Sequence, residues 1–88
     1  MLDVISDVIE ERKRQDEKWG AGRDQDNLVW SSILTEEVGE AAEQSLWVHF
    51  DGIDEARLYK ELIQIAAVAV AWAENLRKRG VPTVVSKF

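Results

Sequence analysis

The feature that most constrains the fold of this chain is an apolar run from Leu62 to Ala73, which only Gln64 interrupts. The run is too short to span a bilayer, since a transmembrane helix needs about 20 apolar residues. Its apolar side chains would surround a helix on all sides and not form a single stripe. The sequence therefore predicts a buried helix, and an 88-residue chain has few other helices with which to cover it.

Residues that break helices gather in three places, at positions 20–27, 51–54 and 80–82. The segments between them show helical spacing of apolar residues and no strand alternation. We expect helices at about Leu2 to Lys18, Leu28 to Phe50 and Asp54 to Arg79. Asn27 and Asp54 are the expected N-caps of the second and third helices, and glycines follow the ends of the first and third.

The predicted fold class is all-α, an antiparallel helix bundle of three main helices per chain that is completed by homo-oligomerisation. Alanines in the apolar run would let a second chain approach closely, which favours a homodimer or a dimer of dimers. Residues 1–88 form a single predicted domain. Its tail, residues 81–88, is expected either to extend along a partner or to be mobile.

Charge and composition exclude several function classes. Seventeen acidic and eleven basic residues give a net charge of −6, which argues against binding to a nucleic acid polymer. With no cysteine and a single histidine, His49, any bound metal must be held by oxygen. The N-terminus lacks the features of a signal peptide, so a cytoplasmic location with no membrane partner is expected.

Two glutamates interrupt the inward face of the second predicted helix. Glu37 and Glu40 lie three residues apart in a series that advances by three or four residues from Trp30 to Val48. Gly39 between them lowers helix propensity by about 1 kcal/mol relative to alanine. Close approach of a ligand or another backbone explains these residues better than a purely structural helix does.

The third predicted helix repeats this arrangement with Glu61 and Gln64. Carboxylates crowded inside a bundle repel one another, and a hard divalent cation relieves that repulsion. We therefore expect Mg²⁺, or Mn²⁺ in its place, with Glu37, Glu40 and Glu61 as ligands and Gln64 in the same oxygen-rich pocket. Glu36 fits either a ligand or a residue that supports the ligands. The alternative for any single glutamate is an ordinary solvated helix face.

The first predicted helix turns from apolar to polar toward its C-terminal end. Its inward line passes Arg12, Gln15 and Trp19, and Arg12, Gln15 and Lys18 are candidates to bind phosphate oxygens. A solvated basic run is the competing interpretation for Arg12. Trp19 and Trp47 lie near helix ends, where an indole ring could stack on a nucleotide base, although most tryptophans only contribute to packing.

These motifs together resemble those of the MazG-like nucleoside triphosphate pyrophosphohydrolases. The family pattern of Glu-Glu-x-x-Glu is matched by residues 36–40, and Glu-x-x-Asp is matched by residues 61–64 except at Gln64. The segment 15–20, Gln-Asp-Glu-Lys-Trp-Gly, and the run 61–72 are similar to the small phage and bacterial members. The resemblance covers about Val8 to Leu76.

The resemblance implies Mg²⁺-dependent hydrolysis of nucleoside triphosphates to the monophosphate and pyrophosphate, as in nucleotide-pool house-cleaning. It maps the metal ligands onto Glu37, Glu40, Glu61 and Gln64, assigns Glu36 to a further metal or to water positioning, and gives Trp47 a base-stacking role. As a mechanism, Glu36 or Glu40 would orient or deprotonate the attacking water. Gln64 brings no negative charge, which leaves the number of metals open. Two alternatives remain: a nucleotide-binding regulator without turnover, and a non-catalytic helical oligomerisation module.

Overall fold

The computed structural model describes residues 1–82, and these form three α-helices: α1 (Leu2–Trp19), α2 (Asn27–Asp51) and α3 (Ala56–Lys78). No strand occurs within that range, so the predicted all-α class is confirmed. Apart from residues 81 and 82, the predicted C-terminal tail lies outside the described residues. None of the three helices is long and apolar enough to cross a membrane.

The helix ends fall within one or two residues of the predicted bounds. Asp26, and not Asn27, caps α2, because the Asp26 side chain accepts a hydrogen bond from the Leu28 backbone N–H at 2.8 Å. Glu55, and not the predicted Asp54, is the N-cap residue of α3 and forms no side-chain cap, although the Asp54 carboxylate accepts a hydrogen bond from the Ala56 N–H at 2.9 Å. Gly52 ends α2 with a φ of 67°, a left-handed conformation that glycine adopts without steric cost.

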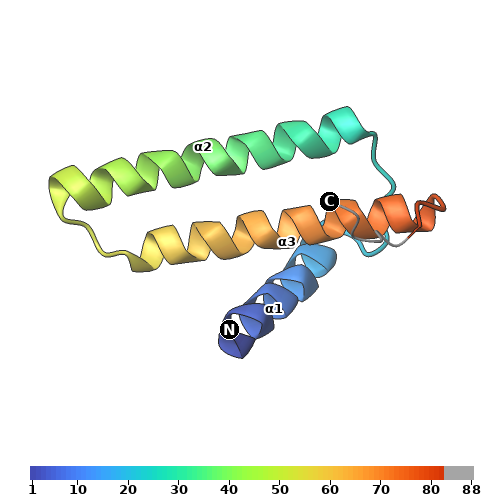
Figure 1. Cartoon of the computed structure of the whole chain (residues 1–88), viewed down its shortest axis with the longest axis horizontal. Coiled ribbons are helices and arrows are strands. Elements are labelled where there is room, and N and C mark those ends of the chain that lie inside the picture. The colour runs from blue at the N-terminus through green and yellow to red at the C-terminus, as the bar shows by residue number, and fades with distance from the viewer. Residues whose placement is uncertain (83–88) are drawn as a thin grey trace.

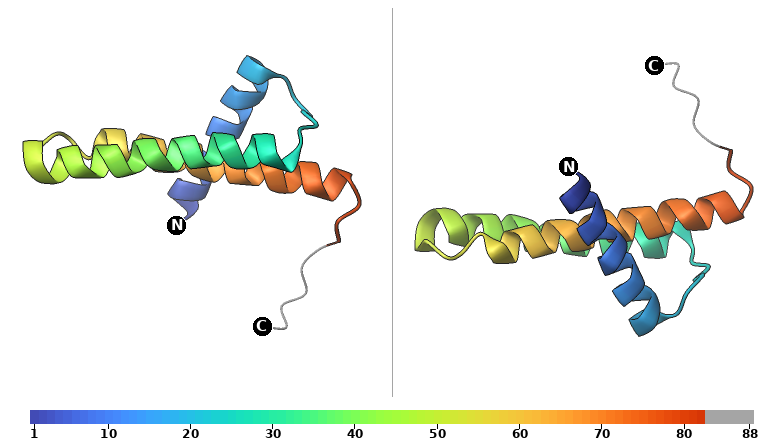
Figure 2. Two further views of the ribbon diagram at one scale, coloured as in Figure 1. Left: turned by 90° about the horizontal axis from the view of Figure 1, so that it is seen from above. Right: turned by 90° about the horizontal axis from the view of Figure 1, so that it is seen from below.

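Helix α3 lies between the other two helices (Figure 1). Helices α2 and α3 run antiparallel, side by side, while α1 crosses α3 on the side away from α2 (Figure 2). Helix α1 therefore does not align with the antiparallel pair as the predicted bundle would require. Ion pairing between Arg12 and Glu74 and a hydrogen bond from the Tyr59 hydroxyl to Asp7 join α1 to α3.

The core is small and lies between α2 and α3. Trp30 is only 1% exposed and forms a buried cluster with Val68 and Ala71. Half-buried apolar side chains pack around this cluster: Ile33, Leu34 and Trp72. The core therefore fixes the N-terminal part of α2 against the C-terminal half of α3.

Several apolar side chains that recur at helical spacing are exposed in the single chain. On α1 these are Val4, Ile5 and Ile9, and on α2 Val38 is also exposed. The reason is geometric, since α1 covers α3 only where the two helices cross. On α3, Tyr59, Leu62 and Val70 are exposed as well.

Candidate functional site

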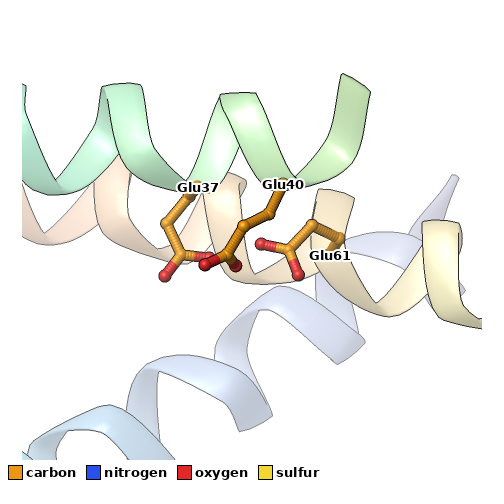
Figure 3. A group of neighbouring side chains, drawn as sticks. All are labelled: Glu37, Glu40 and Glu61. Atoms are coloured by element: carbon orange, nitrogen blue, oxygen red, sulfur yellow. The ribbon is translucent and has the colours of Figure 1, made fainter. Parts of the chain in front are cut away.

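Three carboxylates from two helices meet between α2 and α3 (Figure 3). Glu37 and Glu40 are one turn apart on α2, so their side chains share a face of that helix. Glu61 approaches them from α3. One carboxylate oxygen of each residue lies within 4.8 Å of the others. The predicted convergence of these three glutamates is therefore confirmed.

The three glutamates differ in their exposure to solvent. Glu61 is only 9% exposed, Glu37 is half-buried, and Glu40 is exposed. Burial, followed by the neighbouring carboxylates of Glu37 and then Glu40, raises the pKa of Glu61 to about 8. One buried oxygen of Glu61 and one of Glu37 have no hydrogen-bond partner among the described residues. The cluster is an acidic site with unsatisfied acceptors.

This arrangement has the chemistry of a site for a hard divalent cation. Mg²⁺ and Mn²⁺ prefer carboxylate, carbonyl and water oxygens, and a cation would neutralise the repulsion between these groups. The unpaired buried oxygens of Glu37 and Glu61 are acceptors that a cation can satisfy. The donor set therefore fits Mg²⁺ or Mn²⁺, and their binding remains a prediction.

Two glutamines extend the oxygen-rich region along the helices. Gln64 follows Glu61 by one turn, is half-buried and lines a cavity next to the carboxylates. Gln44 follows Glu40 by one turn on α2, and its side-chain oxygen is buried without a hydrogen-bond partner among residues 1–82. Position 44 falls in the series of inward positions from Trp30 to Val48, so helical spacing could have predicted that this side chain faces inward.

The cavity has a volume of about 440 Å³, which is in the range of small-molecule sites, about 300–1,000 Å³. Its walls come from the C-terminal half of α1, the α1–α2 connection, α2 and α3, and it contains both polar and apolar side chains. The predicted site residues in its walls are Gln15, Lys18, Trp19, Glu36, Glu37 and Gln64. Glu37 thus belongs to both the carboxylate cluster and the cavity.

Gln15 is the most buried polar residue in the cavity wall, at 5% exposure. Its amide nitrogen donates to Glu11 at 3.3 Å, while its amide oxygen is buried and has no partner among the described residues. An unpaired oxygen accepts from a donor, such as a water or a base amino group, and not from a phosphate oxygen. Gln15 is therefore better suited to those donors than to the phosphate predicted from sequence.

The structure does not bring Arg12 into this cavity. Its guanidinium group pairs with Asp16 at 2.9 Å and with Glu74 at 2.8 Å. It lines a separate apolar groove between α1 and α3. These ion pairs already neutralise the charge of Arg12, so the geometry does not support the phosphate role predicted for it from sequence.

Trp47 also lies apart from the cavity. It is 37% exposed and follows Glu37 by ten residues on α2, a distance of about 15 Å along the helix axis. Trp19 is in the cavity wall and is exposed there. Within a single chain, Trp19 is thus the tryptophan placed to stack on a ligand in this cavity.

Two residues that sequence reasoning missed are Arg23 and Asn75. Arg23 lines the cavity from the α1–α2 connection, where helical periodicity gives no information about side-chain direction. Asn75 is 3% exposed and follows Ala71 by one turn on the buried face of α3. The extension of that face at four-residue spacing was the available signal for Asn75.

Comparison of the chain with models of known protein families, with curated protein sequences and with solved structures gave no match. The case for a function therefore depends on the geometry of the site and on the motifs in the sequence.

Proposed function

We propose that this chain is a Mg²⁺-dependent nucleoside triphosphate pyrophosphohydrolase of the MazG-like type. The supporting observation is the convergence of Glu37, Glu40 and Glu61 beside a cavity that also holds cationic side chains. A triphosphate carries negative charge and a planar base. Carboxylates that hold a metal, together with Lys18 and an accessible indole ring, match both parts of such a ligand.

In this proposal, Glu37, Glu40 and Glu61 hold the metal, and Gln64 contributes a neutral amide oxygen. When bound, Mg²⁺ would neutralise phosphate charge and lower the pKa of a coordinated water. Glu36 lines the cavity and is exposed, so its carboxylate is available to accept a proton from the attacking water. Glu40 is the second proposed catalytic carboxylate, at the exposed side of the cluster.

The proposed substrate contacts come from α1. Lys18 lines the cavity and has no carboxylate partner within residues 1–82, so its charge is free to meet a phosphate. Its ammonium lies 4.8 Å from the centre of the Trp19 ring. Trp19 would stack on the base, and Gln15 would accept a hydrogen bond from it or from water. Such a substrate also implies a cytoplasmic location.

We further propose that the active form is a homodimer or a dimer of dimers. The exposed apolar residues of α1 and α3 border a groove of about 530 Å³, lined by Ile5, Val8, Ile9, Ala66 and Val70. An exposed apolar surface of this kind is typical of an interface between subunits. Size-exclusion chromatography with light scattering tests this part, and a monomer at micromolar concentration would contradict it.

A nucleotide-binding regulator without turnover is the second candidate, and Gln64 favours it. A neutral amide at this position leaves the site with one negative charge fewer than four carboxylates would provide. Fewer charges weaken cation binding and the activation of water. In this alternative the cavity binds a nucleotide but does not hydrolyse it.

The deciding experiment is incubation with each standard and several modified deoxynucleoside triphosphates and Mg²⁺, followed by chromatography of the products. We expect the monophosphate and pyrophosphate. Glu37→Gln should abolish product formation, while Glu43→Gln, an exposed glutamate on the same helix, should keep it. Nucleotide binding without products would favour the regulator. Neither binding nor products would favour an oligomerisation module.

A further inference from the structure

Arg23 occupies a distinctive position in the connection between α1 and α2. It is half-buried, and its guanidinium carbon lies 5.0 Å from the centre of the Trp30 ring. Trp30 is itself fixed, because its ring nitrogen donates to Asn75 Oδ1 at 2.8 Å. A cation stacked on a rigid, buried indole has a restricted orientation. The position of the guanidinium group is therefore set by the core.

No carboxylate within residues 1–82 forms an ion pair with Arg23, although Asp16 lies near enough to attract its charge. Other arginines near the site are paired: Arg12 with Asp16 and Glu74, and Arg14 with Glu11 at 2.6 Å. Within residues 1–82, Arg23 has neither an ion pair nor a side-chain hydrogen bond. Burial, and then repulsion by Arg12, lower its pKa from the ordinary value of a guanidinium. A partly desolvated cation without a counter-ion costs free energy until an anion reaches it.

Arg23 lines the cavity of about 440 Å³ together with Glu36, Glu37 and Gln64. It also borders a smaller cavity of about 80 Å³ next to Asp16 and Glu74. A phosphate chain held by a cation at the carboxylates would extend into the larger cavity. A guanidinium group matches phosphate oxygens because its planar N–H groups form paired, charge-assisted hydrogen bonds.

We propose that Arg23 binds the phosphate groups of the substrate, in the role that sequence reasoning gave to Arg12. This inference rests on the proposed function, because the ligand is the polyphosphate part of the same substrate. Lys18 supplies a second cation from α1, so the cavity presents two positive groups without ion pairs in residues 1–82, and Glu37 joins it to the carboxylate cluster. Packing on Trp30 holds Arg23 in place, and the anion completes its interactions.

The test uses the full chain and inorganic tripolyphosphate, which has the phosphates of the substrate without a base. Isothermal titration calorimetry in Mg²⁺ measures tripolyphosphate affinity, and electron paramagnetic resonance of free Mn²⁺ measures metal affinity separately. The variants are Arg23→Gln and Arg23→Met, of which the second keeps an unbranched stem over Trp30. Arg77→Gln, an exposed arginine near the end of α3, is the control with the same loss of charge.

We expect both Arg23 variants to bind tripolyphosphate at least about tenfold more weakly, as for the loss of a charged hydrogen bond. Their Mn²⁺ affinity should stay within about twofold of the wild-type value, and the control should match wild type in both measurements. Two results would overturn this inference and leave the proposed function standing. One is an Arg23 variant that binds both Mn²⁺ and tripolyphosphate as tightly as wild type does. The other is a wild-type chain that binds Mn²⁺ but no tripolyphosphate. Failure of the wild-type chain to bind Mn²⁺ would overturn the proposed function, and this inference with it.

Discussion

Helix α3 carries a buried polar residue near each of its ends, and the two have opposite hydrogen-bonding states. Asn75 and Glu61 are separated by fourteen residues, or about 20 Å along the axis. The Asn75 oxygen accepts from the Trp30 ring nitrogen at 2.8 Å and from the Gln25 backbone N–H at 2.9 Å. Its amide nitrogen donates to Asp24 at 3.0 Å. Asn75 is therefore satisfied within the chain.

Glu61 is buried to a similar degree but faces two other carboxylates. One of its oxygens has no hydrogen-bond partner within residues 1–82, and burial, followed by the carboxylates of Glu37 and Glu40, raises the pKa of Glu61 to about 8. Buried polar groups in folded proteins are normally paired, so an exception calls for an explanation. The comparison teaches that the Asn75 network is closed within residues 1–82 and stabilises the fold, whereas the Glu61 end keeps a buried acceptor that no group in that range satisfies.

The largest expected effect is on activity, in Glu61→Gln. The substitution removes a buried charge that would hold the metal, so metal-dependent pyrophosphate release should fall about 1,000-fold, equivalent to about 4 kcal/mol. The free energy of unfolding without metal should not fall, because glutamine carries no charge to be repelled. Pyrophosphate assays and urea unfolding measure the two quantities. A variant that unfolds more easily yet remains active would reverse the roles of the two ends of α3.

The next effect is a pH dependence that comes from Glu61. Its pKa in the folded chain, about 8, is above the ordinary value of 4.5, so folding favours the protonated form. The resulting stabilisation is fully present below pH 4.5 and is lost as the pH rises through 8. Relative to Glu61→Gln, metal-free wild type should lose about 3 kcal/mol of unfolding free energy between pH 5 and pH 8.

Urea unfolding across this pH range measures the difference. Mg²⁺ at about 10 mM, a concentration that saturates a weak site, should abolish the difference because the cation neutralises the carboxylates. Parallel curves for the two proteins in the absence of metal would show that Glu61 ionises normally. That result would remove the electrostatic part of the contrast with Asn75.

A smaller effect on stability is expected at Asn75, whose hydrogen bonds are satisfied within the chain. Asn75→Ala leaves the Trp30 ring nitrogen and the Gln25 N–H without their acceptor, so the unfolding free energy should fall by about 2 kcal/mol. Asn27→Ala is the matched comparison, since Asn27 is exposed and accepts from Trp72 at 2.9 Å. Its loss should stay below about 1 kcal/mol. Equal losses in the two variants would mean that burial does not strengthen the Asn75 network.

Much of the fold could be predicted because local signals decide it. Gly20, Gly52 and Gly80 have positive φ values of 98°, 67° and 96°, and each follows the end of a helix. The carboxylate cluster was also predictable, since three-residue spacing puts Glu37 and Glu40 on one helix face. The antiparallel pairing of α2 and α3 then brings that face to Glu61.

The roles of the arginines could not be predicted in this way. Helical spacing places Arg12 near Gln15, but the crossing of α1 over α3 directs Arg12 toward Glu74 and Gln15 toward the cavity. That crossing is set by tertiary packing, which periodicity does not report. Arg23 lies in the connection between α1 and α2, where helical periodicity gives no information about side-chain direction. Only the contact with Trp30 in the structure shows where the guanidinium group lies.

The smallest expected effect is a gain, in Gln64→Asp. Gln64 is half-buried, lines the cavity and follows Glu61 by one turn, so aspartate adds a fourth negative charge near the cluster. Mn²⁺ affinity should rise about fivefold, equivalent to about 1 kcal/mol, because ion attraction increases with ligand charge. Thr35→Asp adds the same charge on the exposed side of α2 and should change affinity by less than about twofold.

The same substitution sharpens the contrast along α3. A fourth carboxylate increases repulsion in the metal-free chain, so Gln64→Asp should lower its unfolding free energy at pH 8 while it strengthens metal binding. A fall in unfolding free energy together with a rise in metal affinity distinguishes a ligand site from a structural network. A structural network such as that of Asn75 binds no metal, so only its stability can change. Unchanged Mn²⁺ affinity would mean that Gln64 does not face the ion with the three glutamates, and metal binding would then depend on Glu37, Glu40 and Glu61 alone.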